Sequence, residues 1–311
     1  MFFIINPTAA RGRALREWTK VRREFTDRGV KFDEYVTKHP GEAMQVARWV
    51  LRHGEEAVIA VGGDGTLSEV VNGYFDEAGR VINAKAAIGL LPAGTGSDFR
   101  RSVGLIARND ALDAIKRRET ALLDVLRIEL LDRDDQPVTR HSINVVSFGL
   151  GGEAVTTVNA WRESWPRWIG GRPRFVIAAL KALRNYRNRP VIVRMDGEQA
   201  LEINSNFLVV ANGRFAGGGM MLAPSAELND GLCDVALTDG ATRWDVIREL
   251  PGIQRGSYLN NPKVSYHRAS KVEIACDGAL AVDIDGEAAG FTPAVLTIVP
   301  SSVRFIIGSP K

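Results

Sequence analysis

The sequence predicts an α/β protein in which an N-terminal domain built on a parallel sheet precedes a β-rich second domain. In roughly the first 120 residues, short apolar runs alternate with amphipathic segments, which is typical of a parallel sheet covered by helices on both faces. From about residue 121, turns with glycine, proline or aspartate separate short apolar runs, as in β structure. A length of 311 residues suits two domains, each able to bury its own core.

In the first part, four apolar runs are predicted to be strands: residues 2–6, 32–37, 57–61 and 86–91. Amphipathic patterns predict the helices between them, because apolar residues recur at helical spacing. The first helix has Leu15, Trp18 and Phe25 on this stripe, with Arg22 as a polar exception. Further helices are expected over residues 41–53 and from residue 67 to residue 75.

In the second part, eight segments are predicted to be strands: residues 122–131, 141–150, 190–197, 206–213, 233–240, 271–278, 280–287 and 295–300. Two helices are expected there, over residues 172–186 and near residues 242–250. The chain shows no long linker, low-complexity tract or internal repeat. The expected boundaries are 1–122 together with 295–311 for the first domain, and 123–294 for the second.

Composition excludes several classes of protein. Cys233 and Cys276 are far apart, which argues against a disulfide framework or a cysteine zinc site and favours a reducing cytoplasm. The formal net charge is only +3, so bulk charge gives no argument for a nucleic-acid partner. The apolar N-terminal run is too short for a signal peptide, and no stretch reaches the ~18 apolar residues of a membrane span. A protein of this kind that acts on membrane lipid must do so from the surface.

A glycine-rich turn follows the predicted strand over residues 57–61. It consists of Gly62, Gly63, Asp64, Gly65 and Thr66. Three glycines allow backbone N–H groups to approach a phosphate, and the helix that follows adds a favourable dipole. Thr66 could cap that helix or donate to a phosphate oxygen, and Asp64 makes sense if Mg²⁺ accompanies a nucleotide. The turn is neither a P-loop nor a dinucleotide fingerprint, and a plain strand–helix turn stays open as the alternative.

A second turn of the same kind follows the strand over residues 86–91. Its residues are Pro92, Ala93, Gly94, Thr95, Gly96, Ser97, Asp98 and Phe99. Asn6-Pro7-Thr8 follows the first strand in the same way. Because ligands of open α/β sheets bind beyond the carboxyl ends of the strands, these three turns are expected to build one polar crevice.

Three segments, NPTAARGRA, GGDGTLSEVVNG and LPAGTGSDFRRS, resemble the catalytic domain of the diacylglycerol kinase family, especially its soluble bacterial lipid kinases. MLAPSAELNDGLCDV and DIDGE extend the resemblance over essentially the whole chain. The resemblance implies an N-terminal α/β nucleotide-binding domain and a C-terminal β-sandwich that binds lipid, with the active site between them. It also implies that the last strands, around residues 296–307, return to the first domain.

The resemblance also assigns residues. Carried over by motif, the nucleotide contacts are Asn6, Thr37, Gly62, Gly63, Asp64, Gly65, Thr66, Leu67, Ser68 and Thr95. A structural Mg²⁺ in the second domain would be held by the Asp230 carboxylate and by the backbone carbonyls of Glu227 and Leu232. Ser68 and Ser97 depart from the family, because many relatives have asparagine there; both keep a small polar group but shorten its reach.

Phosphoryl transfer needs positioned groups and charge neutralisation, and a carboxylate to accept the proton of the attacking hydroxyl. The resemblance makes Glu287 the general base, with Asp64 and Asp285 as the other catalytic carboxylates. If residues 285–287 are extended, Asp285 and Glu287 point to the same side of the strand. The alternative is a turn with solvated acids.

Residues 161–189 are the part of the sequence that most resembles a membrane-binding segment. They contain three of the six tryptophans and eight lysines and arginines against one glutamate. Tryptophan and arginine together suit an anionic lipid surface, and a basic solvated helix is the equal alternative. No histidine has ligand or triad spacing, and no nucleophile elbow of a hydrolase is present.

The function expected is that of an ATP-dependent kinase acting on the hydroxyl of diacylglycerol or a related lipid, with Mg²⁺. The protein is expected in the cytoplasm, bound peripherally to the inner face of the membrane, and the sequence leaves a homodimer open. An NAD kinase shares the GGDGT motif but matches GTGSDF and the late DGE less well. A nucleotide-responsive binding protein without catalytic activity is the third possibility, and Ser68 and Ser97 are its best argument.

Overall fold

A computed structural model describes residues 1–93, 97–160, 171–184 and 187–308. The chain divides into two compact units. Unit 1 comprises Met1–Asp124 and Pro300–Lys311, and unit 2 comprises Val125–Val299. The expected division ended the first domain at residue 122 and resumed it at residue 295. Two long strands, β5 (Thr120–Leu131) and β17 (Glu287–Ile306), run from one unit into the other.

Unit 1 contains a parallel sheet. Its strands are β1 (Phe2–Ile5), β2 (Asp33–Val36), β3 (Ala57–Gly62), β4 (Ala87–Pro92) and the end of β17. They lie in the order β17-β4-β3-β1-β2, and each neighbouring pair is parallel. The predicted parallel sheet is therefore confirmed. The C-terminal strand joins it through Arg304 and Phe305, which pair with Ala87 and Ile88.

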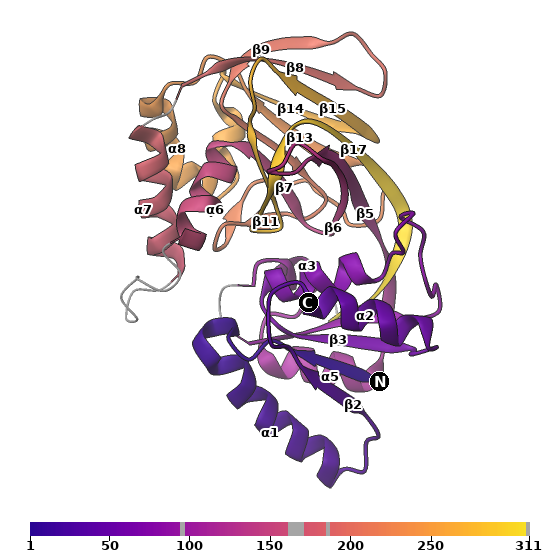
Figure 1. Cartoon of the computed structure of the whole chain (residues 1–311). Helices are drawn as coiled ribbons and strands as arrows, with labels where there is room; N and C mark the ends of the chain where they lie inside the picture. The colour runs from indigo at the N-terminus through magenta and orange to yellow at the C-terminus, as the bar shows by residue number, and fades with distance from the viewer. Residues whose placement is uncertain (94–96, 161–170, 185–186, 309–311) are drawn as a thin grey trace. The chain divides into compact units, whose positions relative to one another are not determined.

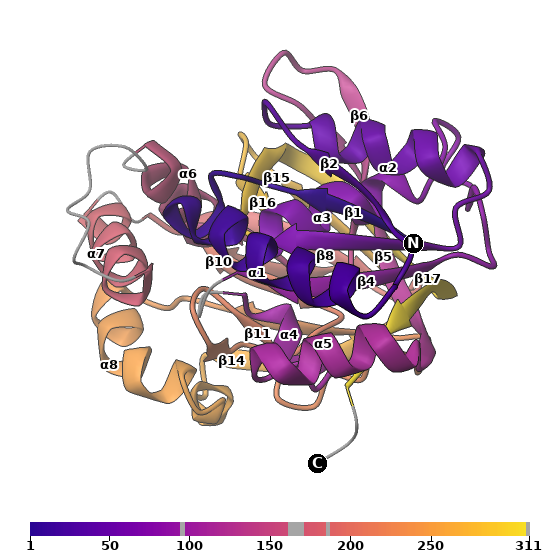
Figure 2. The same cartoon turned by 90° about the horizontal axis from the view of Figure 1, so that it is seen from below.

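Helices cover both faces of this sheet (Figure 1). They are α1 (Arg13–Asp27), α2 (Glu42–Arg52), α3 (Asp64–Gly73), α4 (Phe99–Ser102) and α5 (Arg108–Arg117), with a 3₁₀ turn η1 at Ala9–Gly12. α2 and α3 lie on one face and α1 and α5 on the other, as the view from below also shows (Figure 2). Every residue of β3 and β4 is consequently buried, and both strands are continuous apolar runs, as expected of a sheet covered on both sides.

The buried face of α1 differs from the predicted one. Leu15 is 40% exposed, and Arg22 lies in solvent, where it pairs with Glu34. The core residues are Ala14, Trp18, Val21 and Phe25. The predicted stripe was wrong by one position in part of the helix, because the tryptophan and phenylalanine pack on Phe3 of β1 and so decide which side faces inward.

Unit 2 is built from antiparallel strands, which confirms the predicted β-rich second domain. Besides β5 and β17, they are β6 (Pro137–Ser142), β7 (Val145–Gly149), β8 (Arg189–Met195), β9 (Leu201–Ser205), β10 (Phe207–Ala211), β11 (Phe215–Ala216), β12 (Met220–Met221), β13 (Cys233–Thr238), β14 (Val264–Ala269), β15 (Lys271–Cys276) and β16 (Ala281–Ile284).

The central strands of unit 2 are buried on both faces. Leu208 and Val210 of β10 belong to one apolar cluster, and Val209 and Ala211 of the same strand belong to another. Successive side chains of a strand point to opposite faces, so β10 lies between two cores. The second core is closed by Tyr258 of a 3₁₀ turn, η2 (Ser257–Asn260).

Three helices accompany these strands: α6 (Leu150–Ala160), α7 (Gly171–Arg184) and α8 (Arg243–Ile253). α7 and α8 correspond to the two predicted helices. Thr242 caps α8, because its hydroxyl accepts the Asp245 N–H while the Asp245 carboxylate accepts the Thr242 N–H. Within the described ranges, no helix is both long and apolar enough to cross a membrane. Trp161, Trp165 and Trp168 of the predicted membrane segment lie outside the described residues.

Candidate active site

The turns that follow three strands of unit 1 lie at one edge of its sheet. β1, β3 and β4 are parallel neighbours, so their carboxyl ends meet at the same side. Backbone bonds continue the ladder past the strand ends: the Asn6 N–H donates to Val61 O at 3.1 Å, and the Ala93 N–H donates to Gly62 O at 2.9 Å. The expected grouping of these turns at one edge is what the structure shows. Thr37, which follows β2, is at this edge too, and its N–H donates to Ile5 O at 2.9 Å.

Asn6 connects the first turn to the glycine turn. Its Nδ2 donates to Thr66 Oγ1 at 3.1 Å, and its Oδ1 accepts the N–H groups of Thr8 and Ala9 at 3.1 and 3.2 Å. Thr66 is only 3% exposed, and α3 (Asp64–Gly73) has Gly63 as its N-cap residue, with no side-chain cap. Of the two roles left open for Thr66, helix capping is therefore wrong, because the threonine lies inside the first turn and its hydroxyl accepts a hydrogen bond from Asn6.

Asp64 connects the glycine turn to the second turn. Its Oδ1 accepts the Ser97 hydroxyl at 2.7 Å, and its Oδ2 accepts the Asp98 N–H at 2.8 Å. A third contact, from the Phe99 N–H to Oδ1, measures 3.4 Å. These N–H groups open the short helix α4 and have no partner within it, so a carboxylate from another segment stabilises them. Asp64 was expected to hold a metal ion. In the structure, its carboxylate links the glycine turn to the second turn.

The two glycines before Asp64 differ in what surrounds them. A Cβ at Gly62 would lie 2.3 Å from Thr66 Oγ1, so packing inside the protein excludes a side chain there. Among the described residues, a Cβ at Gly63 would meet nothing within 4 Å, and the φ of −109° is open to any residue. The described part of the chain thus gives no packing reason for glycine at position 63. Close approach of a ligand to the backbone is a reason that remains.

The other expected nucleotide contacts are less accessible. Leu67 and Ser68 are 1% and 9% exposed, and the Leu67 N–H already donates to Gly63 O at 3.1 Å. Gly65 is half-buried in the first turn of α3. Thr95 lies outside the described residues. Backbone groups of the glycine turn, rather than the side chains of Leu67 and Ser68, are left to contact a phosphate.

Replacing Gly63 with valine is expected to weaken ATP binding at least tenfold without disturbing the fold. The new side chain has room in the folded chain and an extended backbone that suits it, but it stands where a phosphate would approach. Titration calorimetry with ATP and a thermal melt measure the two effects. Gly63→Ala, with a smaller side chain, should fall between valine and the parent. An unchanged ATP affinity in a folded Gly63→Val protein contradicts the prediction.

In unit 2, Asp285 and Gly286 form the turn of the β16–β17 hairpin. Both have positive φ, 52° and 89°, and the flanking residues Ile284 and Glu287 pair with each other. Asp-Gly at the centre of a two-residue hairpin turn is a favoured pair for this geometry. The premise that residues 285–287 are extended is thus wrong, and the two carboxylates do not share a strand face.

Asp285 and Glu287 lie in different environments. Asp285 is 7% exposed and accepts the Ser142 hydroxyl at 2.5 Å and the N–H groups of Val145 and Asn144 at 3.1 and 3.2 Å. It therefore anchors the hairpin turn to the residues that lead into β7. Glu287, by contrast, is exposed at the first position of β17. Of the two, only Glu287 offers an accessible carboxylate to a substrate.

Asp283 is a buried carboxyl beside this turn that sequence reasoning missed. One oxygen accepts the Ser147 hydroxyl at 2.9 Å, while the other is buried without a hydrogen-bond partner among the described residues. Burial is the main cause that raises the pKa of Asp283 to about 8, and the negative charge of Asp285 adds to the rise. Burial also raises the pKa of Asp285, to about 6. The sequence feature that could have pointed to Asp283 is the acid at every second position of residues 283–287.

Asp283→Asn is expected to make stability less dependent on pH. Because folded Asp283 keeps a proton that the unfolded chain loses at its usual pKa, the free energy of unfolding of the parent falls between about pH 4 and pH 8. Asparagine removes this loss and should add about 1–3 kcal/mol at pH 8 relative to the parent. Urea unfolding at pH 5 and pH 8 measures it, with exposed Asp277→Asn as the control. An unchanged slope with pH would show that Asp283 is not protonated.

The turn expected to hold a structural Mg²⁺ already contains a cation from the chain. Asp230 Oδ1 accepts the Leu232 N–H at 3.0 Å, and Asp230 Oδ2 pairs with the Arg268 guanidinium. In the described part of the chain, no three His, Cys, Asp or Glu side chains gather as metal ligands, but the expected site uses one carboxylate and two backbone carbonyls. The Mg²⁺ site of Asp230 with the backbone carbonyls of Glu227 and Leu232 therefore stays a prediction.

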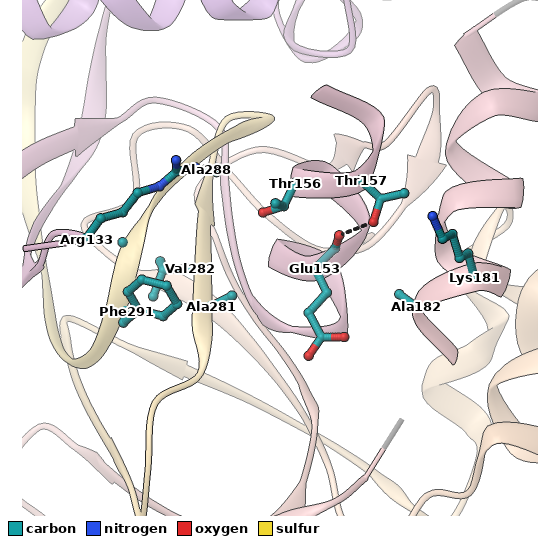
Figure 3. Close-up of a pocket in the computed structure, with 11 residues that line it drawn as sticks. Arg133, Glu153, Thr156, Thr157, Lys181, Ala182, Ala281, Val282, Ala288 and Phe291 are labelled. Carbon is teal, nitrogen blue, oxygen red and sulfur yellow. Dashed lines mark hydrogen bonds between the residues drawn. The ribbon is translucent and has the colours of Figure 1, made fainter. Parts of the chain in front are cut away.

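A cavity of about 490 Å³ lies within unit 2. The cavity is lined by Glu153, Thr156 and Thr157 of α6 and by Lys181 of α7, and Figure 3 shows Thr156 pointing towards β16 and β17 while Thr157 points towards Lys181. Its apolar wall comes from Ala281, Val282, Ala288, Gly290 and Phe291 of β16 and β17. Burial raises the pKa of Glu153, which Arg189 partly opposes. The cavity thus combines an apolar wall with a few polar groups, as ligand sites do. One of its lining residues, Ala288, is the sequence neighbour of Glu287, the expected general base.

Glycine-rich turns at the carboxyl edge of a parallel sheet are a place where many α/β proteins bind phosphate groups. Comparison with known families is more specific. Residues 1–128 match the diacylglycerol kinase catalytic domain, and residues 144–307 match the YegS C-terminal NAD kinase beta sandwich-like domain. The chain belongs to the diacylglycerol kinase family and is a lipid kinase of that family.

Individual relatives agree over most of the chain. It is 29% identical to a diacylglycerol kinase of Mycobacterium tuberculosis (strain CDC 1551 / Oshkosh), covering 97% of this chain and 93% of the relative. It is 30% identical to a probable YegS-like lipid kinase of Xanthomonas oryzae pv. oryzae, covering 97% and 94%. A crystal structure of a putative diacylglycerol kinase from Bacillus anthracis shares the fold, with a TM-score of 0.74, 22% identity and coverage of 99% and 96%.

Proposed function

We propose that this protein transfers the γ-phosphoryl group of ATP to the hydroxyl of diacylglycerol or a closely related lipid. The observation that carries the proposal is the edge of the unit 1 sheet, where Asn6 and Asp64 join three turns around an unobstructed Gly63. Backbone N–H groups and a helix start are suited to triphosphate binding. The names of the relatives, diacylglycerol kinase and lipid kinase, support a lipid as acceptor.

In the proposed reaction, Glu287 accepts the proton of the lipid hydroxyl as its oxygen attacks the γ-phosphorus. The bond between that phosphorus and the bridging oxygen of the β-phosphate breaks, and ADP leaves. Asp64 keeps the two phosphate-binding turns in register, and Asp285 holds the hairpin from which Glu287 projects. Mg²⁺ enters as part of the MgATP substrate and neutralises phosphate charge.

The cavity of unit 2 is the proposed site of the lipid. Its apolar wall suits an acyl chain, and Glu153, Thr156 and Lys181 suit a polar headgroup. We also propose that the protein meets its substrate in the cytoplasm, at the inner face of the membrane, and binds that face peripherally. This placement is part of the proposal because the proposed acceptor is a lipid that resides in the bilayer.

The proposal is tested with radiolabelled ATP and a panel of acceptors in mixed micelles. The panel contains diacylglycerol, phosphatidylglycerol and a sphingoid base, with NAD as the soluble control. Label should appear in the phosphorylated product of diacylglycerol or one of the other lipids, and not in NAD. Labelled NAD phosphate without any labelled lipid would contradict the proposal and support the NAD kinase alternative.

A further inference from the structure

Helices α7 and α8 of unit 2 lie side by side, as both views show (Figures 1 and 2). Val246 of α8 packs against a small cluster that includes Ala182 and Leu183 of α7. The Asn188 side chain also donates to Ala241 O, just before α8, at 2.9 Å. The two helices are therefore neighbours at the surface of unit 2.

The exposed face of α8 is apolar and basic. Trp244 is 63% exposed and Ile247 is 36% exposed. Arg243 and Arg248 are exposed beside them. At ~100° per residue, these four side chains lie on one side of the helix and Asp245 and Val246 on the other. One side of α8 therefore exposes a tryptophan, an isoleucine and two arginines to solvent.

The acids of α8 do not neutralise this face. The Asp245 carboxylate accepts Lys263 Nζ at 2.7 Å, and Glu249 accepts the Asn261 side chain at 2.9 Å. Among the described residues, Arg243 and Arg248 form no ion pair. The positive charge of the two arginines therefore remains available to a negatively charged partner.

The described part of α7 repeats the pattern. Ile177 and Leu180 are each 42% exposed, and Arg184 is exposed one turn further on. Ala178 and Leu183 face the interior. Spacings of three and four residues place the two large apolar side chains and the arginine on one face.

We infer that this α7–α8 surface, defined as Ile177, Leu180, Arg243, Trp244, Ile247 and Arg248, docks on an anionic lipid bilayer. Large apolar side chains are unfavourable in water when they gather on a surface, and tryptophan and aliphatic side chains insert readily at the headgroup level of a membrane. Unpaired arginines beside them complement anionic headgroups and keep their charge in the polar layer. The inference deepens the proposed function, since a bilayer is where a lipid acceptor resides.

The test measures sedimentation with vesicles of phosphatidylserine and phosphatidylcholine, which contain none of the lipid acceptors of the kinase assay, in the absence of ATP. Arg243→Gln with Arg248→Gln should lower the partition coefficient about 30-fold, and added salt should reduce binding of the parent but not of this variant. Trp244→Ala with Ile247→Ala should lower it about tenfold at any salt concentration.

Matched controls change the same residue types elsewhere on unit 2. Arg140→Gln with Arg194→Gln removes the same charge, and Ile192→Ala with Leu201→Ala removes exposed apolar groups of β8 and β9. Both controls should bind vesicles like the parent. Thermal melts should be similar within each matched pair, because Ile247 and Leu201 are each 36% exposed and the four arginines are exposed.

Three outcomes overturn the inference. The first is that both α7–α8 variants sediment like the parent, and the second is that the controls lose as much binding. The third is that Trp244→Ala with Ile247→Ala turns a dimer into a monomer without changing vesicle binding. The last result would make this surface an interface between copies of the chain. Since the vesicles carry no acceptor, surface-dependent binding by a protein that phosphorylates no lipid would contradict the proposed function and leave the docking inference standing.

Discussion

Replacing Glu287 with glutamine is expected to lower kcat on the lipid acceptor by about 10²- to 10⁴-fold, the usual contribution of a general base. Glutamine keeps the shape of the side chain and removes its basicity. Because Glu287 is exposed and lies outside the unit 1 edge that carries the nucleotide turns, MgATP affinity should remain nearly unchanged. Steady-state kinetics with the best acceptor and calorimetry with MgATP separate the two effects.

A matched control for this prediction is Glu198→Gln, which changes an exposed glutamate in the turn between β8 and β9. It should retain full turnover and melt at the same temperature as the parent. Near-full turnover by Glu287→Gln would show that another group accepts the proton. Asp285 would be a poor replacement, since its oxygens are engaged by Ser142 and backbone N–H groups, and Asp64 would then be the candidate to test.

Replacing Asp64 with asparagine is expected to weaken MgATP binding about 10- to 100-fold and to lower turnover as well. The amide offers one acceptor where the carboxylate offers two, so its NH₂ would face a backbone N–H of Asp98 or Phe99. Loss of a hydrogen bond to a charged group costs about 1.5–3 kcal/mol, which corresponds to this range of affinity if the second turn is then misplaced. Calorimetry with ATP, with and without Mg²⁺, measures the effect.

Two further variants define the cause. Ser97→Ala removes one hydrogen bond to Asp64 and no charge, so its effect should be smaller and in the same direction. Asp113→Asn removes the same charge from an exposed position on α5 and should bind MgATP like the parent. Equal affinity of Asp64→Asn and the parent would mean that the link between the turns is irrelevant to the nucleotide.

Only part of the candidate site could be predicted from the sequence. The resemblance pointed to Asp64 and Glu287, but the carboxylates of residues 285–287 were placed by assuming an extended segment. Asp-Gly between two segments with alternating apolar residues is a hairpin signal, and the positive φ of Asp285 agrees with it. Asp283 carried no signal beyond its spacing, because its importance arises from burial against Ser147 of another strand.

The buried face of a helix was likewise only partly predictable from the sequence. The periodic pattern predicted α1 as a helix, and Trp18 and Phe25 in its core, yet Leu15 turned out to be exposed and Ala14 buried. A stripe of apolar residues fixes the orientation of a helix only to within about one position. The aromatic contacts with Phe3 of β1 decide the remainder.

The sequence by itself determined the alternation of strands and helices in unit 1, the β-rich character of unit 2 and the glycine turns at the strand ends. These features depend on periodicity and turn chemistry within a few neighbouring residues. Only the tertiary structure decided that Asp64 would be held by residues 33 and 34 positions away, and Asp285 by Ser142. It likewise brought the outward arginines and Trp244 of α8 beside α7. The physical reason is that buried polar groups must find hydrogen-bond partners, and those partners are selected by the packing of distant segments.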